Sequence, residues 1–184
     1  MTKTGTTAIE SALAPYCEVL MTGAPGLKHM TLKKFNRMVR PVLTSVNVEV
    51  ETVCLIREPE SWLGSWYRYR SRPGIPNKAK ATNGVSFSEF VEAYLAPDQP
   101  EFAKVGRPPR FVETAEGAMG VDHLFQYEQF GLFQAFIEQR FRRRFAFRDE
   151  NTSPRSALSL PQSLRDRLRV ELAEDYALHQ RARR

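Results

Sequence analysis

The sequence has few residues of the kinds that hold metals or disulfides, and it has no long apolar run. Its 184 residues include two cysteines and three histidines, which are scattered rather than grouped. Scattered ligands give no support to a zinc site, and two separated cysteines are typical of buried thiols in a reducing compartment. No stretch reaches the roughly 18 apolar residues that a membrane span needs, and the N-terminus lacks the apolar core of a signal peptide. We therefore expect a cytoplasmic protein with no membrane span and no metal.

The overall composition predicts a folded, basic protein. Hydrophobic residues make up 42% of the chain and aromatic residues 11%, which favours a globule over disorder. The length fits one domain over residues 1–184. A formal net charge of +6 indicates an anionic partner, which could be a nucleic acid, a membrane surface or a polyphosphorylated small molecule. The phenylalanines beside the arginine cluster at 140–144 are typical of a core rather than of a stacking surface, so nucleic acid is not the expected partner. The composition leaves the oligomeric state open.

A short stretch near the N-terminus has the composition of a phosphate site. It consists of Lys3, Thr4, Gly5, Thr6 and Thr7, and a helical pattern follows it directly. Glycine allows the backbone to approach an anion closely, and the first N–H groups of a helix point at it. The lysine adds a mobile positive charge, and the threonines add hydroxyl donors. We call residues 3–7 the glycine loop.

The pattern of the remaining chain predicts an α/β fold. Residues 48–56 end in a short apolar run and residues 123–127 form another, and both are typical of interior parallel strands. Helical patterns follow the glycine loop, Thr31, Pro59, Ser86, residue 131 and Pro161, and residues 151–159 have the composition of a loop. Strands that alternate with helices favour a parallel sheet flanked by helices in a single domain.

Arg57 and Ser65 form a second candidate anion site. Arg57 ends the first predicted strand, and Ser65 lies eight positions further on, about two turns into the following helix. In open α/β sheets ligands gather beyond the carboxyl ends of the strands, so we expect Arg57 and the glycine loop at the same rim. An arginine fork and a hydroxyl suit a phosphate. The two sites together predict a ligand with two separated anionic groups.

These two motifs resemble those of the sulfotransferases that use 3′-phosphoadenosine 5′-phosphosulfate (PAPS). The glycine loop is similar to their 5′-phosphosulfate loop. Residues 54–59 with Ser65 are similar to their 3′-phosphate motif, an Arg-x-Pro strand end followed by a serine. Residues 121–128, 151–154 and 175–176 resemble further segments of bacterial and carbohydrate-type members. The resemblance implies a P-loop-NTPase-like parallel sheet and transfer of a sulfuryl group to a hydroxyl or amine of a carbohydrate or small metabolite.

The resemblance also implies roles for single residues. Lys3 would contact the bridging oxygen and neutralise the departing phosphate. The backbone and hydroxyls of the glycine loop would hold the 5′-phosphate, and Arg57 with Ser65 would hold the 3′-phosphate that distinguishes PAPS from ATP. The family uses a His or Glu as base, often from between the two motifs, which favours His29 and places Glu10 second. A surface or capping role for His29 is the alternative.

Two departures from the family bear on activity. The strand that precedes the phosphate loop in the family is absent from residues 1–184, and the Arg-Lys-Gly motif of the cytosolic members is not found. We expect a start further upstream; a missing strand, or another segment in its place, would also account for the first departure. The second departure points to the carbohydrate-type members, which also lack that motif.

Of three other functions, two remain as alternatives. A P-loop kinase or NTPase is excluded by motif, because G-x-x-x-x-G-K-[ST] is absent. A non-catalytic nucleotide- or anion-binding protein of the same fold is the main alternative. An RNA-binding protein is supported by net charge alone.

Overall fold

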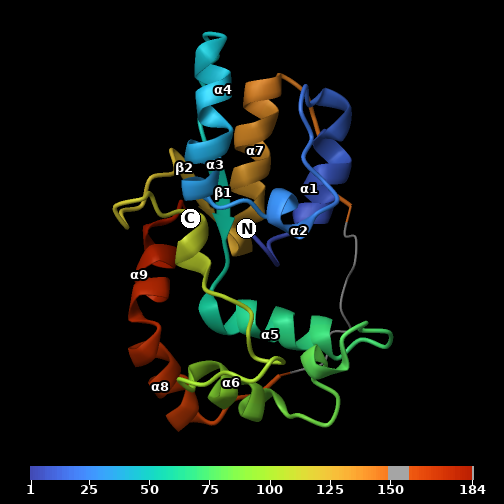
Figure 1. Cartoon of the computed structure of the whole chain (residues 1–184), viewed down its shortest axis with the longest axis vertical. Helices are drawn as coiled ribbons and strands as arrows, with labels where there is room; N and C mark the ends of the chain where they lie inside the picture. Colours follow the sequence, from blue (N-terminus) through green and yellow to red (C-terminus); the bar gives the residue numbers. More distant parts are fainter. Residues whose placement is uncertain (149–157, 184) are drawn as a thin grey trace. The chain divides into compact units, whose positions relative to one another are not determined.

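The computed structural model of the chain describes residues 1–148 and 158–183. It combines helices with two short parallel strands (Figure 1), which agrees with the predicted α/β class. The chain divides into two compact units, and each is described by itself. The first comprises Met1–Arg57, Pro108–Glu150 and Leu178–Arg184, and the second comprises Glu58–Arg107 and Asn151–Ala177. The P-loop-like topology and the single domain over 1–184 stay predictions.

The first unit contains the parallel pair β1 (Val53–Ile56) and β2 (His123–Gln126). Their register runs from Val53 opposite His123 to Ile56 opposite Gln126. Both strands lie within the segments that the sequence predicts, but β1 is shorter than the predicted 48–56. On the far side of β2 the backbone of Arg183 donates to the carbonyl of Leu124 (2.9 Å) and accepts from the N–H of Gln126 (3.1 Å).

β1 is an edge strand, so the prediction that both strands are interior is wrong for it. The N–H of His123 bonds to the carbonyl of Thr52. Since alternate residues of a parallel strand turn their backbone groups to the same side, Cys54 and Ile56 face β2 and Val53 and Leu55 face away. Within the described residues, the sheet has no strand on that other side.

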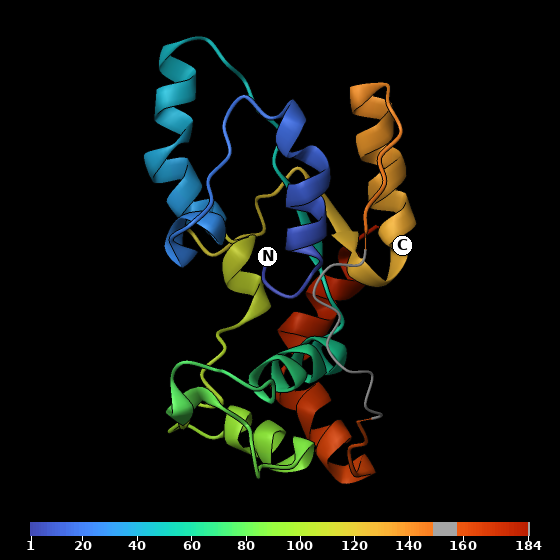
Figure 2. The same cartoon turned by 90° about the vertical axis from the view of Figure 1, so that its right-hand side faces the viewer.

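Two apolar clusters cover the two faces of this sheet. On one face Leu55 and Phe125 pack with α7 (Phe130–Phe141), and Ile9 of α1 (Thr6–Leu13) lies against this cluster. On the other face Cys54, Ile56 and Leu124 pack with Val112 and the C-terminal residues Leu178 and Ala182. The alternation follows from the period of two along a strand. Figure 2 shows α1 and α7 beside the strands.

The helices that follow α1 are η1 (Ala14–Tyr16), α2 (Pro25–Lys28), α3 (Leu32–Met38) and α4 (Arg40–Ser45). In the sequence Pro15 predicts that the first helix bends or ends near Ala14, since proline has no N–H to continue an α-helix. The change from α1 to η1 at Ala14 agrees with this. The predicted cap at Thr31 is confirmed, because its hydroxyl accepts from the N–H of Lys34 at 3.3 Å. Two expectations are wrong. The helical spacing after Thr31 predicts that Val42 faces the core, but Val42 is exposed, and Cys17 is an exposed thiol rather than a buried one.

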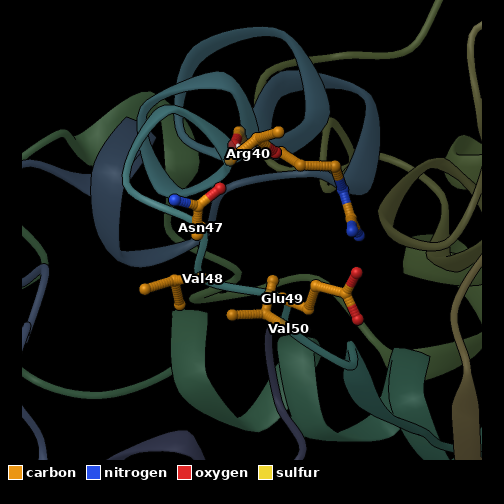
Figure 3. Close-up of a pocket in the computed structure, with 6 residues that line it drawn as sticks. Arg40, Asn47, Val48, Glu49 and Val50 are labelled. Atoms are coloured by element: carbon orange, nitrogen blue, oxygen red, sulfur yellow. Dashed lines mark hydrogen bonds between the residues drawn. The ribbon is translucent and has the colours of Figure 1, made fainter.

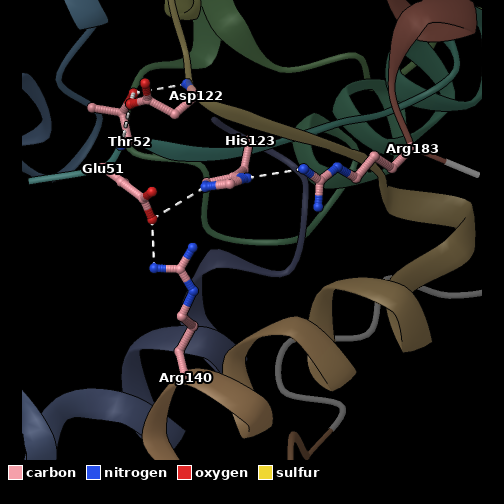
Figure 4. Close-up of polar contacts among 6 residues, drawn as sticks. All are labelled: Glu51, Thr52, Asp122, His123, Arg140 and Arg183. Atoms are coloured by element: carbon pink, nitrogen blue, oxygen red, sulfur yellow. Dashed lines mark hydrogen bonds and ion pairs between the residues drawn. The ribbon is translucent and has the colours of Figure 1, made fainter.

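A polar network fixes the start of both strands (Figure 4). Asp122 accepts from the N–H and the hydroxyl of Thr52, both at 2.7 Å, and these bonds lower the pKa of Asp122. The imidazole of His123 lies between Glu51 (3.2 Å) and the guanidinium of Arg183 (3.1 Å). A guanidinium can only donate, so Nδ1 of His123 accepts and Nε2 carries the proton that it donates to Glu51. The network thus joins three stretches of the chain.

The second unit is helical. Its helices are α5 (Pro59–Arg70), η2 (Lys78–Lys80), α6 (Phe87–Leu95), α8 (Gln162–Glu171) and the first part of α9 (Ala173–Arg181). Two further short helices, η3 (Pro108–Phe111) and η4 (Tyr127–Gln129), belong to the first unit. Trp62 and Phe90 are fully buried, and Trp62 meets Tyr94 edge to face at 6.3 Å. One predicted helix after Pro161 is in fact two, because the chain leaves helical geometry at Leu172.

Ser86 and Glu89 have the sequence spacing of a capping box, and the structure confirms this box at the start of α6. The hydroxyl of Ser86 accepts from the N–H of Glu89, and the carboxylate of Glu89 accepts from the N–H of Ser86. We expect Ser86→Ala to lower the free energy of unfolding by about 1 kcal/mol, since one first-turn N–H loses its acceptor. Chemical denaturation measures this change, and Ser88→Ala in the same helix is the control. Equal effects of both substitutions would contradict the cap.

No helix among the described residues has the length and apolar content to cross a membrane. The predicted loop at 151–159 lies almost wholly outside the described residues.

Candidate phosphate site at the glycine loop

The glycine loop is built on two residues with left-handed backbone. Lys3 has φ 63° and Gly5 has φ 70°, so the chain turns twice before α1 begins at Thr6. Between them Thr4 is buried, and its hydroxyl donates to the carbonyl of Met1 at 2.9 Å. The Thr4 side chain therefore stabilises the turn from within, while Thr6 and Thr7 are half-buried at the start of the helix.

The start of α1 has the geometry of an anion site. Gly5 is its N-cap residue and gives no side-chain cap to the helix. The first N–H groups of a helix have no partner within it. A left-handed residue followed by a helical one turns successive N–H groups toward the same point, which makes an anion-binding concavity. Gly5 and Thr6 form such a pair, and the positive end of the α1 dipole adds to it.

Gly5 lies against aromatic side chains. A Cβ at this position would be 3.3 Å from Cε2 of Tyr127 and 3.8 Å from Cε2 of Phe130. The first distance is tighter than ordinary van der Waals contact. Both the positive φ and the close approach of Tyr127 therefore favour glycine here.

Arg57 meets the glycine loop, as the sequence predicts. Its Nη1 donates to the carbonyl of Lys3 at 3.3 Å, and its guanidinium carbon lies 4.8 Å from the centre of the Tyr127 ring. Residues 54 positions apart in the sequence thus come together within the first unit. The cause is the parallel sheet, because Arg57 follows β1 and Tyr127 follows β2 at the same edge.

Tyr127 is the residue of this site that sequence reasoning missed as a site residue. The guanidinium of Arg57 lies over its ring, and the ring edge lies next to Gly5. A signal was available: Tyr127 directly follows the second predicted strand, where side chains of parallel strands converge.

Ser65 belongs to α5 in the second unit, where it is half-buried. Its predicted part in holding a 3′-phosphate stays a prediction.

His29, the favoured base, ends α2 as its C-cap residue. Beside His29, Lys28 of α2 forms an ion pair with Glu10 of α1, and this pair joins the two helices. Partial burial holds the pKa of His29 below its ordinary value, and the positive charges of the Met1 amino group and Lys28 lower it further, against the opposing charge of Glu10. Its Nδ1 is buried and has no hydrogen-bond partner among the described residues. The imidazole is therefore neutral at pH 7 and able to take a proton.

Lowering the pH should destabilise the protein through His29. The unfolded chain protonates this residue near pH 6.5, whereas the folded state resists protonation because its pKa is lower. The free energy of unfolding should therefore be largest above about pH 6.5 and fall as the pH decreases through the folded pKa. Denaturant titrations of the wild type and of His29→Asn measure the difference. Parallel pH profiles for the two proteins would contradict the lowered pKa.

Two hollows lie elsewhere in the first unit. One, of about 470 Å³, is lined by Arg40, Thr44 and residues 47–50, and Arg40 and Glu49 turn their charged groups toward each other across it (Figure 3). The other, of about 570 Å³, lies between residues 49–53 and the end of α7. Neither lining includes a predicted site residue.

The described residues contain no group of three or more His, Cys, Asp or Glu that could hold a metal ion. Comparisons with protein-family models, with curated proteins and with solved structures find no match.

Proposed function

We propose that the chain is a sulfotransferase that uses PAPS to sulfate a hydroxyl or amine. The observation that carries the proposal is the meeting of Arg57 with the glycine loop through the carbonyl of Lys3. Two candidate anion-binding elements in one unit, both beside Tyr127, suit a nucleotide with a phosphate at each end. ATP has no 3′-phosphate to occupy the arginine.

The residues of the site fit the donor by charge and by donor type. The N–H groups at the start of α1 and the hydroxyls of Thr6 and Thr7 would hold the 5′-phosphate. Arg57 would hold the 3′-phosphate through its fork. Lys3 would place its ammonium where negative charge develops on the departing phosphate.

His29 would act as the base. The acceptor's oxygen or nitrogen forms the new bond to sulfur as the bond between sulfur and the bridging oxygen breaks, and the acceptor's proton passes to the imidazole. A neutral imidazole is needed for this step, and the lowered pKa supplies it at pH 7. The phosphate product leaves as 3′-phosphoadenosine 5′-phosphate (PAP).

A thermal-shift experiment with PAP tests the nucleotide site. We expect saturating PAP to raise the midpoint of unfolding and ATP at the same concentration to leave it unchanged, because a ligand stabilises the state that it binds. Arg57→Ala should weaken PAP binding about 10- to 100-fold, as the loss of charge-assisted hydrogen bonds does elsewhere. Arg57→Lys keeps the charge without the fork. Its affinity for PAP should lie between those of the wild type and of Arg57→Ala.

The same proteins distinguish transfer from binding alone. Release of PAP from PAPS with a panel of hydroxyl and amine acceptors reports transfer. PAP binding without turnover would favour the non-catalytic nucleotide-binding protein. Equal shifts by PAP and ATP, or a PAP shift that survives Arg57→Ala, would overturn the proposal.

A further inference from the structure

Residues 19–48 form a stretch without a single acidic residue. Between Glu18 and Glu49 the chain carries five basic residues, namely Lys28, Lys33, Lys34, Arg37 and Arg40. The same stretch has many exposed large apolar side chains, which are Val19, Leu20, Met21, Leu27, Met38, Val42, Val46 and Val48. Exposed apolar side chains that lie among charged side chains of a single sign are typical of an interaction surface rather than of an ordinary solvated face.

Within this stretch, α3 and α4 act almost as one helix. The N–H of Val39 bonds to the carbonyl of Phe35, and the carbonyl of Val39 accepts from Leu43, so the ladder continues across the junction. Val39 itself has helical dihedral angles. Both views show the two helices following one another along nearly the same direction (Figures 1 and 2).

The helix pair carries an exposed ridge. Met38, Val42 and Val46 follow one another at intervals of four, which places them on one side of the helix. Their exposed fractions are 50%, 64% and 62%, whereas Leu32 on the inner side is 4% exposed. Val46 directly follows α4. The apolar ridge is therefore not part of the core of the first unit.

Basic side chains continue and flank this ridge. Lys34 lies one turn before Met38 on the same line, and Lys33 and Arg37 form the neighbouring line. Lys33 and Arg37 are exposed, and neither forms an ion pair with a described residue. The ammonium of Lys34 donates to the carbonyl of Gly26 at 3.0 Å, which holds α2, with its exposed Leu27, near this end of α3.

We propose that α3 and α4 dock on an anionic lipid surface. Lysines and arginines beside a row of exposed apolar side chains suit a bilayer with negative headgroups, where the apolar groups enter the interface and the charges meet the phosphates. The ridge contains no aromatic residue on which a base could stack, so single-stranded nucleic acid fits it less well. This surface uses none of the glycine-loop residues, so the inference does not depend on the sulfotransferase proposal.

Vesicle sedimentation with the full chain tests the surface. We expect binding to vesicles that contain phosphatidylserine, little binding to phosphatidylcholine alone, and weaker binding in high salt. Lys33→Glu with Arg37→Glu should reduce partitioning about 25-fold or more, since each basic residue near an anionic surface contributes about fivefold. The triple variant Met38→Ser, Val42→Ser and Val46→Ser should reduce partitioning about tenfold or more, while its net charge stays constant.

Lys78→Glu with Lys80→Glu is the matched control. These lysines are exposed in η2 of the second unit, and the substitution changes the net charge by the same amount. It should leave vesicle binding nearly intact, and circular dichroism checks that all variants fold. Equal loss in the control would assign binding to net charge and overturn the proposal. RNA binding that needs Lys33 and Arg37 but not the apolar ridge, or self-association through the ridge without vesicle binding, would also overturn it.

Discussion

Gly5→Ala is expected to weaken PAP binding by about 100-fold or more while the protein stays folded. Alanine at φ 70° costs about 1–2 kcal/mol of backbone strain. Its Cβ would also lie 3.3 Å from Tyr127, so either the loop or the ring must shift. A shift turns the N–H groups of Gly5 and Thr6 away from their common point, and each charge-assisted bond lost there costs about 1.5–3 kcal/mol. Isothermal titration with PAP measures the loss.

Gly23→Ala separates strain from site geometry. Gly23 has φ 84°, so alanine there meets the same kind of backbone strain, but no atom lies within 4 Å of the added Cβ. We expect this variant to lose a similar amount of stability and to bind PAP like the wild type. PAP affinities that fall together in both variants would show that the glycine loop has no special part in binding.

Lys3→Gln is expected to lower the rate of sulfuryl transfer about 100- to 1,000-fold, a size typical of removing one group that stabilises developing charge. PAP affinity should change far less, because the backbone N–H groups of the loop remain. Glutamine keeps most of the side-chain length and leaves the left-handed backbone of Lys3 with a residue of similar bulk. Single-turnover measurements of PAP formation separate the chemical step from binding.

Lys78→Gln removes the same charge from an exposed site in the second unit and should leave the rate unchanged. A Lys3→Gln enzyme with wild-type turnover and affinity would remove Lys3 from the mechanism, and a loss of affinity with an unchanged single-turnover rate would assign it to binding alone.

Local signals predicted the helices well. Thr31, Ser86 and Pro59 mark helix starts because each acts within one turn of its own position, through a hydroxyl cap or a fixed φ. The break at Leu172 was missed, since the apolar spacing of Leu164, Leu168 and Leu172 continues through it. Spacing reports which side is buried and does not report where the hydrogen bonds end.

Features set by distant partners were harder to predict. The apolar run before Arg57 indicates a buried strand, but no local pattern predicts that, within the described residues, β1 pairs with a strand on one side only. The backbone of Arg183 pairs with β2 although no strand pattern surrounds it. The meeting of Arg57 with the glycine loop could be predicted because the carboxyl ends of parallel strands converge by geometry. Tyr127 obeys the same rule but resembles an ordinary core aromatic in the sequence.

The division of the first unit into three stretches of sequence has a consequence for biosynthesis. Thr52 and Asp122, which are hydrogen-bonded at the start of the two strands, lie 70 positions apart in the sequence. β1 is therefore synthesised about 70 residues before its partner β2. At roughly 5–20 residues per second, the apolar side chains of β1 wait several seconds for β2. The second edge of β2 waits longer still, until Arg183 has been translated. The nascent sheet is therefore open to chaperones, and to unwanted pairing, from the synthesis of β1 until Arg183 has been translated.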